Sequence, residues 1–288
     1  MQCNAYEKNI NYVYYMKKYA FVLLHFGSSL KYFEYELYFV KMLRKWSSPG
    51  IDLIYMCIQD DTPNTTPDFF VETMHKYFDK VYIIKSLPHA ENYVSHYTHF
   101  NTLHTCNFIY GYKLTKYDKV CIVESDMVIT ENISDIFNLP TPSVLVLNNE
   151  SKYDSSVGSP INGGIMLFKP SWYSWYTSLA SMPGVIQDNA KYPNEELFLR
   201  TWKKINPLPE RYNYCHYHLS KLTAKDKLPS IVHFNETKWK VLDIIRDKYS
   251  NKFPAKVRVV EYFKKNFYYR YVGEIDAILS EARSLGLV

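Results

Sequence analysis

Cysteine is sparse in this chain and follows none of the spacings that bind metals or form disulfide frameworks. The 288 residues include five cysteines, an odd number, and no C-x-x-C pair. This argues against a disulfide scaffold and against a structural zinc site. Reduced thiols are typical of the cytosol, so we expect a cytoplasmic protein.

Long apolar runs are also lacking. The apolar run nearest the N-terminus, Tyr19 to Phe26, is too short to cross a bilayer and has no small-residue cleavage site. We therefore expect no transmembrane segment, signal peptide or anchor. Internal repeats and low-complexity linkers are missing as well, which predicts one main domain over residues 1–252 and a C-terminal helical extension over residues 253–288.

The charge of the chain is mild. A formal net charge of +5 and a pI of about 8.7 permit an anionic ligand such as a nucleotide diphosphate but do not require nucleic acid. A basic, aromatic RNA-binding protein is an alternative that predicts steeply salt-dependent binding. Because no RNA-binding motif is present, we expect no nucleic-acid partner. The basic aromatic stretch Phe263 to Tyr271 could contact a membrane or a partner, or pack on the domain as a helix.

Strand and helix signals alternate through the first half of the chain. Apolar runs predict strands at 19–26, 51–59, 81–85, 119–123, 143–148 and 162–168, and helical periodicity predicts helices at 32–45, 68–78 (with Asp68 as the cap), 97–114 and 172–179. A polar loop is expected over 149–160. This order predicts an α/β fold with a mainly parallel sheet flanked by helices and ligands at the carboxyl ends of the strands.

The most informative stretch is the predicted strand 119–123, which ends in Glu124-Ser125-Asp126. Side chains two apart on extended backbone project to the same side, so both carboxylates can bind one cation. Hard oxygen ligands suit Mg²⁺ or Mn²⁺, which commonly neutralise a diphosphate. The other interpretation is a solvated turn in which the acids have no ligand.

Three blocks together resemble glycosyltransferase family 8, the glycogenin-like enzymes. They are VESDMVITENISDIF from Val123, INGGIMLFKPS from Ile161 and IVHFNETKW from Ile231, with weaker support from AFVLLHFGSSL at Ala20 and PNEELF at Pro193. The resemblance covers residues 20–239. It implies a GT-A fold and a retaining transfer of a hexose or N-acetylhexosamine from a UDP-sugar to a glycan or protein acceptor. Relatives of glycogenin are often dimers, so the resemblance allows a homodimer.

The resemblance also implies a set of ligands for a metal ion. In the family, an Asp-x-Asp pair and a histidine in an apolar-apolar-His-Phe segment hold the ion, and here Glu124, Asp126 and His233 occupy those places. In the family the first Asp also reaches the ribose of the donor, and here Glu124 is one methylene longer than that Asp. An imidazole beside two carboxylates favours Mn²⁺, with Mg²⁺ as the alternative. Lys238 matches the family's diphosphate-binding lysine, although a Gly usual in that segment is missing. A histidine at a strand end can also be purely structural.

The remaining site residues are carried over from the same blocks. The resemblance implies that Asn162 and Gly163 bind the donor sugar. It places Asn194 and Glu195 beneath the anomeric carbon, with Glu196 as the substitute for Glu195 if the register shifts by one. It places Leu24 and Tyr32 at the uracil end of the site. The main alternative function is a catalytically inactive nucleotide-sugar-binding protein. Three departures from the family pattern suggest it: Glu124 replaces the usual Asp, the Gly before Lys238 is missing, and Asn194-Glu195 stands where the family has an Asp-Gln pair.

Overall fold

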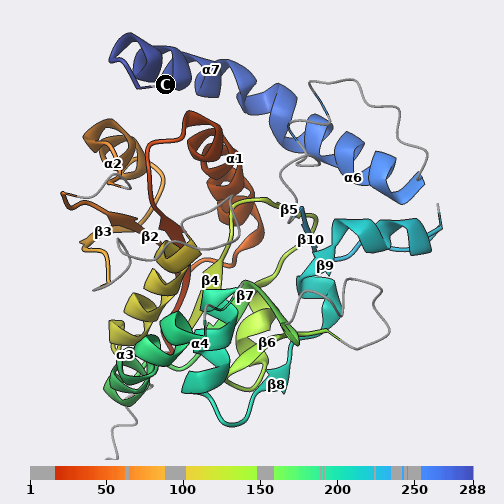
Figure 1. The fold of residues 1–288 in the computed structure, drawn as a ribbon. Coiled ribbons are helices and arrows are strands. Elements are labelled where there is room, and N and C mark those ends of the chain that lie inside the picture. Colours follow the sequence, from red (N-terminus) through yellow and green to blue (C-terminus); the bar gives the residue numbers. More distant parts are fainter. Residues whose placement is uncertain are drawn as a thin grey trace, which may run out of the picture.

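The computed structural model describes residues 17–61, 65–87, 102–147, 159–188, 190, 192–223, 225–234, 242, 245 and 254–287. Its centre is a seven-stranded sheet in the order β3-β2-β1-β4-β7-β6-β8 (Figure 1). The strands are β1 (Tyr19–His25), β2 (Ile51–Ile58), β3 (Lys80–Ile84), β4 (Lys119–Val123), β6 (Ser143–Val146), β7 (Ile161–Phe168) and β8 (Asn206–Pro207).

The first four strands of this sheet are all parallel, as the alternation of strands and helices predicts. Strand β7 then runs antiparallel to both β4 and β6, which makes the sheet mixed but mostly parallel. A second sheet has the order β5-β10-β9 and consists of β5 (Met127–Ile129), β9 (Tyr214–Cys215) and β10 (Ile231–His233). The α/β prediction is confirmed, and the short second sheet brings segments about a hundred residues apart next to the end of β4.

Each face of the large sheet has its own hydrophobic core because neighbouring strand residues point to opposite sides. In β1, Phe21 and Leu23 belong to one core and Ala20 and Val22 belong to the other. The first core includes α1 (Leu30–Trp46) and the C-terminal helices, and the second includes η2 (Thr102–Lys113), α3 (Trp172–Gln187) and α4 (Pro193–Thr201). Because both faces of the sheet are covered, we expect ligands to bind at the edge where the strands end.

The helices differ from the sequence prediction in extent more than in existence. Helix α2 is Asp68–Met74, and Pro67 rather than Asp68 is its N-cap, so the predicted Asp68 cap was wrong. The helix predicted at 97–114 is described from Thr102 and is a 3₁₀ helix, η2, and not an α-helix. Helix α3 continues through Pro183 to Gln187, beyond the predicted end at 179. The other described short 3₁₀ segments are η3 (Ser134–Asn138), η4 (Glu210–Tyr212) and η5 (His216–Lys221). Residues 149–158 of the loop expected at 149–160 lie outside the described residues.

The C-terminal residues form α6 (Pro254–Phe263), the π-helical turn η6 (Lys264–Tyr268) and α7 (Tyr269–Ser284), drawn in blue above α1 (Figure 1). Phe263 and Phe267 are fully buried, and Phe263 meets Tyr38 of α1 edge to face at 5.5 Å. The basic aromatic stretch therefore packs its phenylalanines on the domain, as the packed-helix alternative predicts. The division into a domain and an extension stays a prediction. No helix among the described residues is long and apolar enough to span a membrane.

Candidate active site at the end of strand β4

Glu124 and Asp126 lie directly after β4, and backbone hydrogen bonds fix the segment on both sides. The Glu124 N–H donates to the carbonyl of Gly164 in β7 at 3.1 Å. The Phe234 N–H donates to the carbonyl of Asp126 at 2.8 Å, and β10 pairs with β5 so that His233 lies opposite Met127. These contacts bring His233 to the two carboxylates, which the spacing in sequence alone could not establish.

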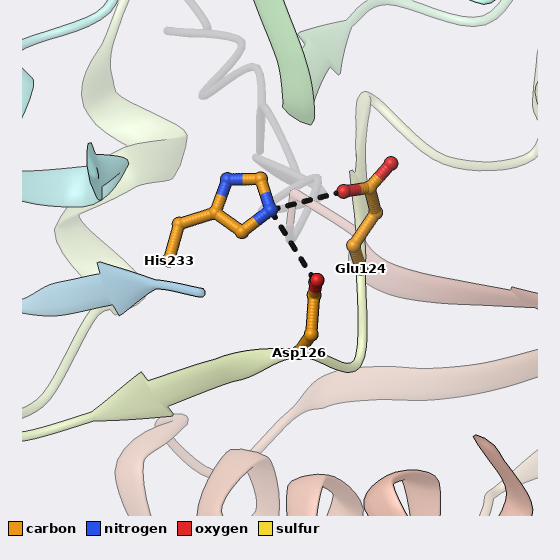
Figure 2. A group of neighbouring side chains, drawn as sticks. All are labelled: Glu124, Asp126 and His233. Carbon is orange, nitrogen blue, oxygen red and sulfur yellow. Dashed lines mark ion pairs between the residues drawn. The ribbon is translucent and has the colours of Figure 1, made fainter. Parts of the chain in front are cut away.

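Figure 2 shows both carboxylates directed at the same imidazole nitrogen. His233 Nε2 lies 3.1 Å from Glu124 Oε2 and 3.3 Å from Asp126 Oδ1. One ligand atom from each of the three residues lies within 4.8 Å of the other two. The extra methylene of Glu124 therefore does not prevent it from reaching the group.

The chemistry of this donor set fits a divalent cation. The His233 side chain is 2% exposed, and its Nε2 is buried without a partner of hydrogen-bond geometry although both carboxylates are close. A buried polar atom without a partner is costly, and a metal ion between Nε2 and the two oxygens would supply one. Glu124 is 43% exposed and Asp126 14%, so the group is open to solvent on the Glu124 side.

The charge balance points the same way. Burial disfavours the imidazolium, but the carboxylates of Asp126 and Glu124 outweigh it and raise the pKa of His233 well above its usual value. The two carboxylates facing this nitrogen thus favour a positive charge between them, which a divalent cation would supply.

Glu195 lies next to this group, on α4. The residue is 7% exposed, and its Oε1 accepts a hydrogen bond of 2.8 Å from the Gly163 N–H. Burial raises its pKa to about 7, with the charge of Glu124 adding to the shift and hydrogen bonds from Ser159 and Gly163 opposing it. Glu196 instead pairs with Arg200 one helical turn later, at 2.6 Å. The structure thus turns Glu195, and not its substitute Glu196, toward the site.

Four of the expected residues meet around one small cavity of about 70 Å³. Leu24, Gly163 and Asn194 line it together with Glu124, and the rest of its wall is mostly apolar. A Cβ at Gly163 would lie 2.7 Å from Met166 Cε, 2.9 Å from Asn194 Nδ2 and 3.1 Å from Glu195 Cγ, so these side chains would have to shift to admit it. Gly163 thus packs against side chains of α4, and its contact with a donor sugar stays a prediction.

Two further expected residues, Tyr32 and Asn162, are not among the residues that line this cavity. Burial and the charge of Asp126 raise the pKa of Tyr32. The stacking of its ring on a base stays a prediction. Asn162 uses its side-chain oxygen within the protein, accepting hydrogen bonds from the Gly164 N–H and from Asn213. Lys238 lies outside the described residues.

Two features escaped the sequence analysis. Asn213 is fully buried, and its Oδ1 is 2.9 Å from His233 Nδ1, yet nothing in its local sequence suggests a role. At the end of β1, the buried His25 contacts Glu36 at 2.6 Å and donates from Nε2 to the Gly27 carbonyl at 2.9 Å. Burial disfavours its charge, but Glu36 raises the pKa of His25, so this ion pair supports the turn after β1.

Solved structures of glycosyltransferases with the GT-A fold superpose on this chain. The glycosyltransferase GlyE from Streptococcus pneumoniae TIGR4 superposes with a TM-score of 0.58 at 16% identity, over 94% of this chain and 64% of that chain. The galactosyltransferase LgtC, in complex with donor and acceptor sugar analogs, superposes with a TM-score of 0.55 at 12% identity, over 85% of this chain and 94% of that chain. The expected GT-A fold is confirmed; identities this low speak for the fold alone.

Comparison at the level of sequence adds little. No protein-family model matches the chain. An uncharacterized protein of Acanthamoeba polyphaga mimivirus is 29% identical over 118 residues, which cover 35% of this chain and 41% of that protein. The chain spans less than two thirds of the length of both the mimivirus protein and GlyE.

Proposed function

We propose that the protein is a metal-dependent, retaining glycosyltransferase that transfers a hexose or N-acetylhexosamine from a UDP-sugar to a glycan or protein acceptor. The observation that carries the proposal is the convergence of Glu124, Asp126 and His233 at the carboxyl end of β4, in a GT-A fold. A divalent cation, Mn²⁺ before Mg²⁺, would neutralise charge on the leaving diphosphate when bound there.

The residues around the cluster divide the remaining work. Glu195, held by the Gly163 N–H, is proposed to lie beneath the anomeric carbon, where its carboxylate stabilises positive charge as the bond to the diphosphate breaks or attacks that carbon transiently. Asn194 lines the same small cavity as Gly163 and would orient the sugar. Lys238 would balance charge on the diphosphate, and this role rests on the sequence resemblance alone.

The electrostatics of Glu195 suit this role. In the metal-free protein its pKa of about 7 leaves the carboxyl partly protonated near neutrality. A cation beside Glu124 would remove the nearby negative charge that raises this pKa, and so would favour the carboxylate. Metal binding and readiness of Glu195 are thereby linked through Glu124.

Release of free UDP from a panel of UDP-sugars tests the proposal. Wild type is compared with Asp126→Ala and with Asp276→Ala, a control that removes an exposed acid on α7. We expect one or a few donors to be hydrolysed in Mn²⁺, no hydrolysis in EDTA or by Asp126→Ala, and full activity in Asp276→Ala.

Other outcomes would revise the proposal in different ways. Tight UDP binding without cleavage of any donor, even when candidate acceptors are supplied, would favour the inactive nucleotide-sugar-binding protein. Failure to bind UDP at all would contradict both functions.

A further inference from the structure

His233 has a hydrogen-bonding partner on the side away from the two carboxylates. Its Nδ1 lies 2.9 Å from Asn213 Oδ1, and both residues are buried. The Nδ2 of the same asparagine donates to Asn162 Oδ1 at 2.8 Å and lies 3.4 Å from the Asn162 backbone carbonyl. Asn162 Oδ1 in turn accepts from the Gly164 N–H at 3.1 Å. The result is a continuous chain of hydrogen bonds from β7 to the imidazole.

The direction of every bond in this chain follows from its first member. A backbone N–H can only donate, so the Gly164 amide requires the oxygen of Asn162 to face it. That oxygen, together with the Asn162 backbone carbonyl, requires Asn213 to present its Nδ2. The Oδ1 of Asn213 is therefore turned to His233, and Nδ1 of the imidazole must carry the proton.

This polarity decides what the other nitrogen can do. With the proton on Nδ1, the Nε2 of a neutral imidazole carries its lone pair toward Glu124 and Asp126, which is the form that ligates a metal. Without the acceptor at Asn213, either nitrogen could carry the proton. A ring free to take the opposite tautomer would present an N–H to the cation.

Gly164 fixes the position of the same ring. A Cβ at this residue would lie 2.4 Å from His233 Cε1 and 2.6 Å from Nδ1, so only glycine leaves room for the imidazole at its present position beside β7. The glycine thus supplies both the amide that starts the chain and the space that the ring occupies.

We propose that Asn213 is the positioning residue of the metal site: through Asn162 and the Gly164 amide, it holds the Nδ1–H tautomer and the ring orientation that turn His233 into a ligand. This inference rests on the metal site proposed above. Partners of this kind behind a metal-binding histidine typically change metal affinity 10- to 100-fold.

The test measures Mn²⁺ binding alone, without nucleotide, from the loss of the electron paramagnetic resonance signal of free Mn²⁺. Asn213→Leu should weaken binding by about 10- to 100-fold. Asn206→Leu is the matched control, because the Asn206 amide also donates to a backbone carbonyl, that of Pro142, but on the edge strand β8. The control should bind Mn²⁺ as wild type does.

A double-mutant cycle separates positioning from a general loss of structure. If Asn213 acts through His233, Asn213→Leu should have no further effect on Mn²⁺ affinity in a His233→Ala background. An equal loss in both backgrounds, or an affinity of Asn213→Leu within about twofold of wild type, would overturn the inference.

Two further variants keep the outcome clear. If Asn213→Leu does not fold, Asn162→Ala removes the acceptor that orients Asn213, and a smaller loss that disappears in the His233→Ala background is expected. If Asp126→Ala binds Mn²⁺ as tightly as wild type, the proposed metal site itself is wrong, which is a different result from an unchanged Asn213→Leu.

Discussion

Replacing Gly164 by alanine should damage the site although no proposed metal ligand is substituted. The added Cβ would lie 2.4 Å from His233 Cε1 and 2.9 Å from Met127 Cε, whereas ordinary contacts begin at 3.4 Å. The ring would have to move by roughly 1 Å, the difference between these distances, and His233 is buried with Asn213 behind it. Overpacking of this size typically costs about 1 to 3 kcal/mol of unfolding free energy.

The same shift should reduce metal binding, because ligand distances tolerate only about 0.2 Å. We expect Mn²⁺ affinity to fall at least about tenfold, and urea unfolding in EDTA to show the loss of stability. The matched control is Gly273→Ala in α7, where a Cβ would meet nothing within 4 Å. Alanine should stabilise that helix by about 0.5 to 1 kcal/mol and leave metal binding unchanged. Wild-type stability and affinity in Gly164→Ala would refute the reasoning.

Two further changes test the ionisable groups. Glu36→Gln removes the partner of the buried His25, and should cost about 3 to 5 kcal/mol of unfolding free energy near pH 6. Folding raises the pKa of His25, so the stability that this ion pair contributes is fully present below pH 6.5 and is lost as pH rises through the pKa of the folded state. The difference in unfolding free energy between wild type and variant, measured with urea, should therefore shrink with increasing pH. A difference that stays constant with pH would contradict this prediction. Glu195→Gln should lower kcat about 100-fold and change Mn²⁺ affinity far less, whereas Glu196→Gln, which alters only a pair with Arg200, should keep full activity. Wild-type kcat/KM should rise with pH through a pKa no higher than about 7, and a fall over that range would exclude a carboxylate role for Glu195.

Strands β1, β2 and β4 were predictable because each is a short, mostly buried apolar run, and the edge strand β3 was predictable from its apolar residues although little of it is buried. Strands β1, β2, β3 and β4 lie within two residues of their predicted ends. Helix boundaries were less predictable, since they depend on tertiary contacts. Helix α3 continues through Pro183, which local propensity treats as a stop, and η2 takes the 3₁₀ form in a segment whose apolar spacing allowed an ordinary helix.

The candidate site shows the same division between local and tertiary information. Glu124 and Asp126 could be predicted from one strand end, and His233 could be added only through the family resemblance. The orientation of Glu195 was present in the sequence, because Glu196 and Arg200 are spaced i, i+4 and form a pair on the exposed side. Asn213 could not be found this way, because its role depends on the pairing of β9 with β10, and this pairing is not encoded in the residues around it.

The most direct test of the central claim is the position of Mn²⁺ in crystals soaked with MnCl₂ and UDP, located by anomalous scattering. We predict a single strong anomalous peak within about 2.5 Å of His233 Nε2, of one oxygen of Glu124 and of one oxygen of Asp126. The diphosphate is expected to complete the coordination of the ion. The peak should be absent from crystals of Asp126→Ala. A Mn²⁺ ion bound elsewhere, or UDP bound with no ion between these three residues, would contradict the account.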